Sequence, residues 1–407
     1  MSMNTPKLRF SQFTDSWNLD KLIAKVSLYS GLTYTPDDVR SDGTLVLRSS
    51  NVQNGEISLL DNVYVNPSVA KSQNVEVGDI IVVVRNGSRA LIGKHAQIKS
   101  SMLNTVIGAF MTGIRSGYPN FMNALLSSGK FGQEVEKNLG ATINQITNAT
   151  FNSMEFFYPN DEEQIAIGDF FTSLDSMISL TSKKIEKLKQ TLTGCMQTMF
   201  PQEGELEPKI RFKGFEGKWK SIPLKEIAKK KTDKNVGVKY DITLTNSAEY
   251  GVINQRDFFD HDISNSNNIG GYYIIDNDDF VYNPRISVTA PVGPINRNQL
   301  GYTGIMSPLY LIFNVDGINI DYLSCFFKTT LWHNYMKLNG NSGARFDRLA
   351  ISDDAFFNMP IAVPQDSKEQ LRIANYFKSL NEIISLQTKR LYLLKHIKSA
   401  CLNNMFV

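Results

Sequence analysis

The stretch that decides the fold is 164-QIAIGDFFTSLDSMISLTSKKIEKLKQTLTGCMQTMF-200. It returns near the end of the 407-residue chain as 370-QLRIANYFKSLNEIISLQTKRLYLLKHIKSACLNNMF-406. Every match lies at the same offset of 206 residues, as for Phe171 and Phe377, so neither copy has gained or lost a residue. A repeat of this length indicates that one structural element was duplicated.

Each copy has the pattern of one long helix. Apolar side chains step by three and four residues, as in a coiled-coil seam, and Pro159 and Pro364 lie just ahead of the two stretches. About 36 residues at roughly 1.5 Å each give a rod of about 50 Å. We expect the helices to pair antiparallel through a seam of Phe171, Leu174, Ile178, Thr181, Leu188, Phe377, Leu380, Ile384, Gln387 and Leu394.

The seam has one polar position in common, occupied by Thr181 in the first helix and by Gln387 in the second. In a symmetric antiparallel pair these side chains would meet near the midpoint, and a polar contact there would fix the register at some cost in stability. This is a hypothesis. A Gln387→Leu variant with equal or greater stability and a single unchanged register would count against it.

A second repeat marks the start of each copy. The opener 7-KLRFSQFTDSWNLDKL-22 returns as 209-KIRFKGFEGKWKSIPL-224, at an offset of 202 and with a rare Trp in common. Weaker matches in between drift from an offset of 200 to one of 206, which indicates small loop insertions. We therefore expect a duplicated domain-plus-helix, with the segments divided as domain, helix, linker, domain and helix at 1–160, 161–200, 201–208, 209–364 and 365–407.

Composition and local pattern indicate folded α/β (α+β) domains. Apolar residues make up 42% of the chain and aromatic residues 11%, which is enough for packed cores and argues against global disorder. DIIVVVR, from Asp79 to Arg85, has the pattern of a buried strand. The first residues lack the apolar core of a signal peptide, and no stretch is apolar enough to span a bilayer, so the expected location is the cytoplasm.

Net charge, cysteine spacing and the absence of common motifs argue against several classes of protein. A formal net charge of +3 is lower than is usual for a free-standing nucleic-acid-binding protein. It fits a chain whose partners neutralise part of the phosphate charge. The three cysteines lack CxxC spacing, which argues against a disulfide framework and a structural zinc site. There is no Walker A loop, no HExxH and no Asn/Asp-Pro-Pro-aromatic sequence, so the chain lacks common motifs of ATPases, metalloproteases and amino-methyltransferases.

Duplication itself points toward DNA. Two copies of a domain with paired helices have approximate two-fold symmetry, as a DNA duplex does. Domains held on a rod could read two half-sites at a fixed separation. The alternative is a coiled-coil scaffold whose twin domains bind protein or glycan, and salt dependence would separate the two, since phosphate contacts weaken as salt rises.

The order of segments resembles the specificity subunit of type I restriction–modification enzymes. The resemblance covers essentially the whole chain. It rests on 162-EEQIAIGDFFTSLD-175, on its counterpart 369-EQLRIANYFKSLN-381, and on the Arg-Phe-x-x-Phe openers that begin at Arg9 and Arg211. It implies two tandem target-recognition domains with pseudo-two-fold symmetry, separated by two long helices that form an antiparallel coiled coil.

The resemblance also implies partners. A specificity subunit would recognise a bipartite, asymmetric site in double-stranded DNA and would have no catalytic residues of its own. It would dock two modification (methyltransferase) subunits and restriction (motor-nuclease) subunits, with no membrane partner. No cofactor or metal is expected in this chain, whereas S-adenosylmethionine, ATP and Mg are expected on the partner subunits.

Candidate DNA contacts lie in three kinds of loop. The first follows the buried strand, where Arg and Asn suit guanine and adenine edges: Arg85, Asn86, Arg89 and, in the second copy, Arg285. The second is a polar loop that recurs with different residues: Thr142, Asn144 and Gln145, then Lys337, Asn339, Asn341, Arg345 and Arg348. The third holds Arg297 and Asn298. The alternatives are a solvated loop, a polar turn and an exposed hairpin, respectively.

Overall fold

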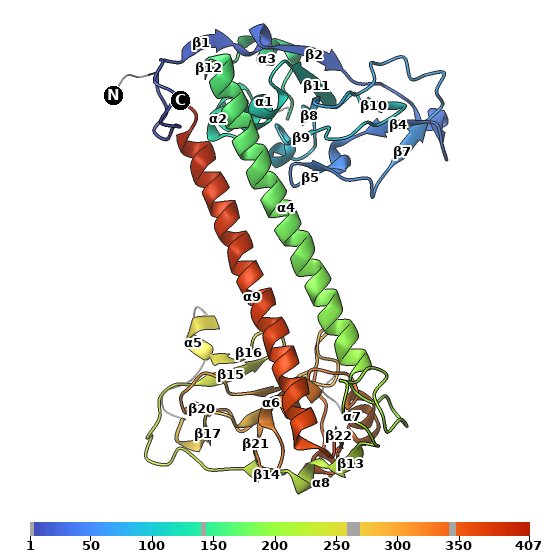
Figure 1. Ribbon diagram of the computed structural model, residues 1–407, viewed down its shortest axis with the longest axis vertical. Coiled ribbons are helices and arrows are strands. Elements are labelled where there is room, and N and C mark those ends of the chain that lie inside the picture. Colours follow the sequence, from blue (N-terminus) through green and yellow to red (C-terminus); the bar gives the residue numbers. More distant parts are fainter. Residues whose placement is uncertain (1–3, 140–143, 259–268, 342–346) are drawn as a thin grey trace. The chain divides into compact units, whose positions relative to one another are not determined.

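The chain folds into two compact units. The computed structural model describes residues 4–139, 144–258, 269–341 and 347–407. Unit 1 consists of residues 1–183 with 388–407, and unit 2 of residues 184–387. Both long helices expected from the repeat are present, as α4 (Asp161–Thr198) and α9 (Ser367–Asn404) (Figure 1). Each unit includes part of each helix, and the domain limits drawn from the sequence stay a prediction.

Unit 1 is built on two small sheets. One is antiparallel in the order β2-β11-β8-β9, with β2 (Val26–Ser30), β11 (Met111–Ser116), β8 (Ile80–Val83) and β9 (His95–Gln97). The other has the order β10-β4-β7-β3, with β10 (Thr105–Ile107), β4 (Thr44–Leu47), β7 (Val63–Val65) and β3 (Val39–Arg40). The predicted strand in DIIVVVR is β8, and all four of its residues are buried.

Shorter elements complete unit 1. β1 (Asn18–Lys21) pairs with β12 (Glu155–Tyr158), and β5 (Val52–Gln53) forms a hairpin with β6 (Glu56–Ile57). Its α-helices, besides the parts of α4 and α9, are α1 (Pro119–Leu126), α2 (Gly129–Asn138) and α3 (Asn148–Ser153), and 3-10 turns lie at Leu22–Ala24, Pro36–Asp38, Ser49–Asn51 and Arg89–Leu91. α1 lies close to the N-terminal end of α4 in Figure 1, and both contribute to one hydrophobic core.

Unit 2 repeats this plan. Its main sheet has the order β14-β21-β18-β19, with β14 (Ala228–Lys231), β21 (Leu311–Val315), β18 (Phe280–Tyr282) and β19 (Ile295–Arg297). Three strand pairs accompany it: β13 (Lys220–Pro223) with β22 (Pro360–Val363), β15 (Leu244–Ser247) with β16 (Gly251–Asn254), and β17 (Tyr273–Ile275) with β20 (Gly304–Met306). The main sheet of unit 2 has the same strand order as the β2-β11-β8-β9 sheet of unit 1, which confirms the duplication.

The helices of unit 2 also follow unit 1. α6 (Ile320–Phe326), α7 (His333–Asn339) and α8 (Asp353–Phe357) take the places of α1, α2 and α3, while α5 (Gln255–Phe258) is additional. Two 3-10 turns lie at Leu224–Glu226 and Ile269–Gly271. Both units are therefore mixed helix-and-sheet domains, as predicted.

Within each unit the two long helices run antiparallel, because the start of one lies beside the end of the other. In unit 1 the Phe406 ring stacks on Phe171, with ring centroids 6.1 Å apart, and Lys398 pairs with Asp175. In unit 2 Phe200 stacks on Phe377, also at 6.1 Å. The core of each unit is thus closed by residues from a distant part of the sequence.

The expected seam is buried unevenly. Phe171, Leu174, Thr181, Phe377 and Leu380 are buried. The other predicted seam residues are half-buried: Ile178, Leu188, Ile384, Gln387 and Leu394. The Thr181 hydroxyl donates to the Met177 carbonyl of its own helix at 2.7 Å. A contact between Thr181 and Gln387 stays a prediction, because the two residues belong to different units.

Each long helix begins in one unit and ends in the other, so a residue just after each helix can be used to test one unit at a time. Phe406 is 4% exposed and packs in unit 1, whereas Phe200 is fully buried in unit 2. A buried Phe→Ala substitution costs about 3–5 kcal/mol. We therefore expect Phe406→Ala to accelerate amide exchange in unit 1 and Phe200→Ala, its matched counterpart, in unit 2, as measured by mass spectrometry. The opposite assignment, or an equal effect on both units, would contradict this.

Candidate nucleic-acid interface

Each unit brings two of the predicted loops together. Arg85, just beyond β8, forms a backbone bridge with Gln145, and Arg285, just beyond β18, forms the same bridge with Arg348. Neighbouring amides repeat the pattern. Ile146 N–H donates to the Val84 carbonyl, and Leu349 N–H donates to the Pro284 carbonyl, both at 2.9 Å. The strand-end loop and the polar loop therefore form one paired surface at an equivalent place in both units.

In unit 1 this surface is held by hydrogen bonds among its own residues. Asn86 Nδ2 donates to Ser49 Oγ at 3.1 Å, and Asn144 Nδ2 donates to the Gly87 carbonyl at 3.0 Å. Arg89 pairs with Glu136 at 2.7 Å. The exposed Arg85 guanidinium lies 5.1 Å from the centroid of the Phe110 ring. Arg85 is thus the most available cation of this loop, because the Phe110 ring orients it without neutralising it.

In unit 2 the same surface carries two arginines that share one carboxylate. The Arg285 side chain is 64% exposed and its Nε lies 4.0 Å from Asp347. Arg348 is less exposed and lies 3.9 Å from the same carboxylate. One carboxylate thus sits between two guanidinium groups, which leaves a net positive charge on the pair of loops.

The remaining loop candidates of unit 2 flank these two arginines. Lys337 and Asn341 are exposed. Asn339 is exposed as well, and its Nδ2 caps the end of α7 by donating to the Tyr335 carbonyl. Two further candidates, Thr142 and Arg345, lie outside the described residues.

The prediction for Arg297 and Asn298 has to be corrected. The Arg297 side chain is only 8% exposed and pairs with Asp321 at 2.6 Å. Asn298 is fully buried, and its Nδ2 donates to the carbonyls of Asp276 and Tyr302 at 3.0 Å. Both side chains are held by contacts within unit 2, and neither extends into solvent from a loop as expected. Arg297 is the last residue of the edge strand β19 and Asn298 follows it, so neither lies in an exposed hairpin.

The structure also explains the openers, whose chemistry the sequence did not reveal. Arg9 forms a two-pronged ion pair with Glu163 near the start of α4, at 2.7 Å for both contacts. Arg211 does the same with Glu369 near the start of α9, at 2.7 and 2.8 Å. Both carboxylates are buried. The recurring Arg and Glu therefore fasten each opener to its helix.

The described residues show neither a metal-binding cluster nor a membrane-spanning helix. Within the described ranges, no three His, Cys, Asp or Glu side chains are grouped so that they could hold a metal ion. No described helix combines the length and apolar character required to cross a membrane.

Comparison with known proteins finds related sequences for part of the chain. Residues 31–190 match a family model described as the type I restriction modification DNA specificity domain. The chain is therefore similar to type I restriction–modification specificity subunits over this part of its sequence. It is 25% identical, over 187 residues, to the StySPI specificity subunit of Salmonella potsdam and to the EcoKI specificity subunit of Escherichia coli strain K12. The match spans 44% of this chain and only 40% of either relative.

Solved structures extend the likeness in fold to the whole chain. The S subunit of a type I restriction–modification system from M. genitalium superposes with a TM-score of 0.60, at 14% identity, over 99% of both chains. A chain from a structure of type I R-M complex assembly superposes with a TM-score of 0.51, at 14% identity, over 95% of this chain and 96% of its own. The chain therefore shares its fold, with two tandem domains and two long helices, with these structures.

The paired loops can be tested one unit at a time. We expect Arg85→Ala and Arg285→Ala each to weaken DNA binding by about 1–3 kcal/mol, the usual value of a good base contact. Arg40→Ala removes the same charge from an exposed strand outside these loops and serves as the control. Fluorescence anisotropy with labelled duplex would measure the effect. Losses no larger than that of Arg40→Ala would contradict a role for these arginines.

Proposed function

We propose that this chain is the specificity subunit of a type I restriction–modification complex and that it recognises a bipartite, asymmetric DNA site, with one half-site read by each unit. The observation that carries the proposal is the equivalent placement of the paired loops, whose exposed side chains nevertheless differ. Arg85 faces Gln145 across the bridge in unit 1, and Arg285 faces Arg348 in unit 2. A common framework with different side chains is what two readers of unlike half-sites require.

In this proposal the chain supplies recognition and its partners supply the chemistry. Methyl transfer from S-adenosylmethionine would occur on modification subunits, and ATP- and Mg-dependent cleavage on restriction subunits. The chain would act in the cytoplasm, where bacterial DNA lies. The two relatives are named as subunits of restriction enzymes, which supports a role within a larger complex.

Matched apolar positions on the long helices support docking of two copies of one partner. Three exposed residues of α4 in unit 1 have counterparts on α9 in unit 2, 206 positions later. Their exposed fractions agree closely: Ile165 at 53% and Leu371 at 49%, Met177 at 43% and Ile383 at 42%, Leu180 at 68% and Leu386 at 65%. A partner that covers one set would find the same set in the other unit, as two modification subunits would.

The proposed function is tested by mapping methylated adenines in DNA from cells that express this chain with its modification subunits. We expect a motif of two unlike halves separated by a fixed unspecified gap. The affinity of the purified complex should fall as salt rises, because phosphate contacts release counterions. Salt-insensitive binding to a protein or glycan, without selectivity for DNA sequence, would instead favour the scaffold alternative.

Docking is tested with charges placed on the matched positions. We expect Leu180→Lys to remove one modification subunit from the complex, Leu386→Lys to remove one, and the double variant to remove both. The reason is that an ammonium buried in an apolar interface without a partner is costly. Native mass spectrometry would count the subunits. Leu103→Lys changes a residue that is 86% exposed and off the helices, and it should retain both subunits.

A further inference from the structure

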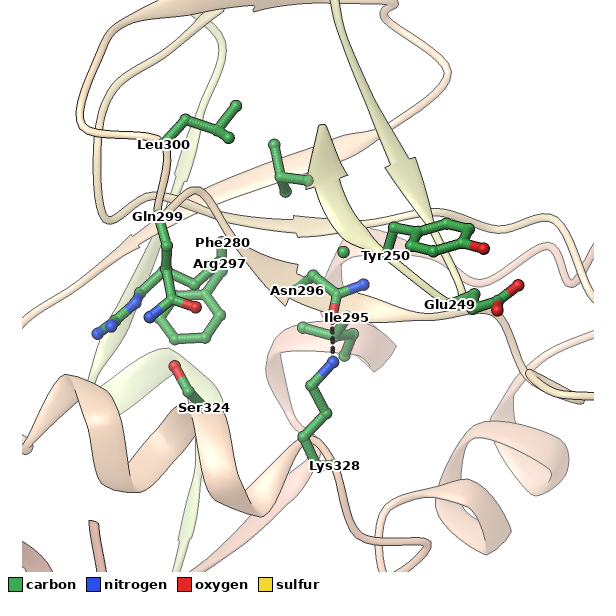
Figure 2. Close-up of a pocket in the computed structure, with 12 residues that line it drawn as sticks. Glu249, Tyr250, Phe280, Ile295, Asn296, Arg297, Gln299, Leu300, Ser324 and Lys328 are labelled. Carbon is green, nitrogen blue, oxygen red and sulfur yellow. Dashed lines mark hydrogen bonds between the residues drawn. The ribbon is translucent and has the colours of Figure 1, made fainter. Parts of the chain in front are cut away.

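Both units contain a pocket at an equivalent place, apart from the paired loops. In unit 2 the pocket has a volume of about 240 Å³ and lies between the edge strand β19, the end of α6 and the turn of the β15–β16 hairpin (Figure 2). In unit 1 the corresponding hollow is bordered by β9, the end of α1 and the turn of the β5–β6 hairpin, and α4 and α9 line its other side. The hairpin turns hold Tyr250 in unit 2 and Asn54 in unit 1.

The strand registers and helix ends make the two pockets comparable residue by residue. His95 pairs with Val82 across the edge of the unit 1 sheet, as Ile295 does with Tyr282 in unit 2. At the helix ends, Ser128 Oγ donates to the Leu125 carbonyl, and Thr329 Oγ1 donates to the Phe326 carbonyl. The residue before each of these hydroxyls lines its pocket. It is a serine in unit 1, Ser127, and a lysine in unit 2, Lys328.

Lys328 is an ammonium held in place without an anion. Its Nζ donates to Asn296 Oδ1 at 2.5 Å, the contact drawn as a dashed line in Figure 2. Among the residues that the structure describes, no carboxylate forms an ion pair with it; the residue is partly open to solvent, and desolvation by the surrounding protein lowers its pKa. An ammonium has three N–H donors. Asn296 uses one of them, so the others can serve a ligand that enters the pocket.

A buried network fixes the direction of this lysine. Asn296 Nδ2 donates to Asn246 Oδ1 at 2.7 Å and to the Ser247 carbonyl at 3.1 Å. Asn246 in turn donates to the Val281 carbonyl at 2.8 Å. Both asparagines are at most 5% exposed. The amide of Asn296 therefore presents its oxygen toward Lys328, and the lysine loses less freedom when it binds than a mobile surface lysine would.

The counterpart in unit 1 is neutral. His95 Nε2 lies 3.0 Å from Ser127 Oγ, and its Nδ1 lies 3.0 Å from the Gly93 carbonyl. Burial lowers the pKa of His95, which favours the uncharged form of its imidazole. Four lysines border the rest of this hollow, Lys99, Lys183, Lys395 and Lys398; Lys99 pairs with Glu56, and Lys398 pairs with Asp175. Equivalent places in the two units thus offer different hydrogen-bonding groups.

We propose that Lys328 is a specificity-determining residue of unit 2, which donates to the O6 and N7 acceptors of one guanine in the half-site that this unit reads. This inference rests on the proposed function. Guanine is the base with two adjacent acceptors in the major groove, and a cationic donor on those atoms is the commonest specific contact. The neutral group at Ser127 selects a different base pair in the other half-site.

The experiment compares methylation motifs in cells that express the modification subunits with either the wild type or the Lys328→Ser variant, which carries the unit 1 residue. We expect one guanine of one half-site to become unspecified, while the other half-site keeps its sequence. Binding of the purified complex to the wild-type site should weaken about 5- to 150-fold, which corresponds to the usual 1–3 kcal/mol for such a contact. Lys328→Arg should keep the preference for guanine.

Controls separate the possible failures. Lys229→Ser removes the same charge from an exposed residue of unit 2 outside the pocket, and it should leave the motif unchanged. An unchanged motif in Lys328→Ser overturns the inference. So does an equal loss of affinity for all sequences with a smaller salt dependence, because that result marks a phosphate contact. If the wild-type complex yields no bipartite motif, the proposed function itself fails.

Discussion

Each unit depends on a carboxylate that is buried next to the start of a long helix. Glu163 and Glu369 are at most 1% exposed, and a carboxylate withdrawn from water in this way is costly unless its charge is matched. Arg9 and Arg211 match it with two parallel hydrogen bonds, the geometry in which guanidinium and carboxylate fit best. Losing one partner of such a pair costs about 3–5 kcal/mol. The opener and the helix are therefore coupled, and the rest of each domain is built between them.

The two units share this fold but differ in the hydrogen bonds and pKa values of equivalent polar groups. Trp17 Nε1 donates to Glu163 at 3.2 Å, whereas the buried Trp219 Nε1 has no hydrogen-bond partner among the described residues. Burial raises the pKa of Asp279 although Lys231 opposes it. Burial acts in the same direction on Asp79, but hydrogen bonds from Arg115, the Glu76 amide and Tyr29 outweigh it and lower that pKa. The duplicated scaffold has been kept while its polar groups have diverged.

Periodic features could be predicted from the sequence, and isolated polar side chains could not. The heptad steps and the preceding prolines located α4 and α9 to within three residues, because a helix needs a continuous pattern. Arg297 and Asn298 were misjudged because a polar residue in a loop has the same composition whether it faces solvent or satisfies buried carbonyls. Lys328 was missed because a lysine at the end of a helix is usually solvated. The strand register aligns Lys328 with Ser127, and only this alignment shows that the two units carry different side chains at an equivalent place.

Because the end of α9 belongs to unit 1, the two units become complete at different times during translation. Unit 2 is one continuous segment, residues 184–387, whereas unit 1 needs residues 388–407 to cover Trp17 and Phe171. During translation the second unit therefore has all of its sequence before the first unit does, although the first begins to emerge earlier. Until the last helical turns leave the ribosome, the apolar surface around Trp17 stays uncovered, and it is the part of the nascent chain most in need of protection from aggregation.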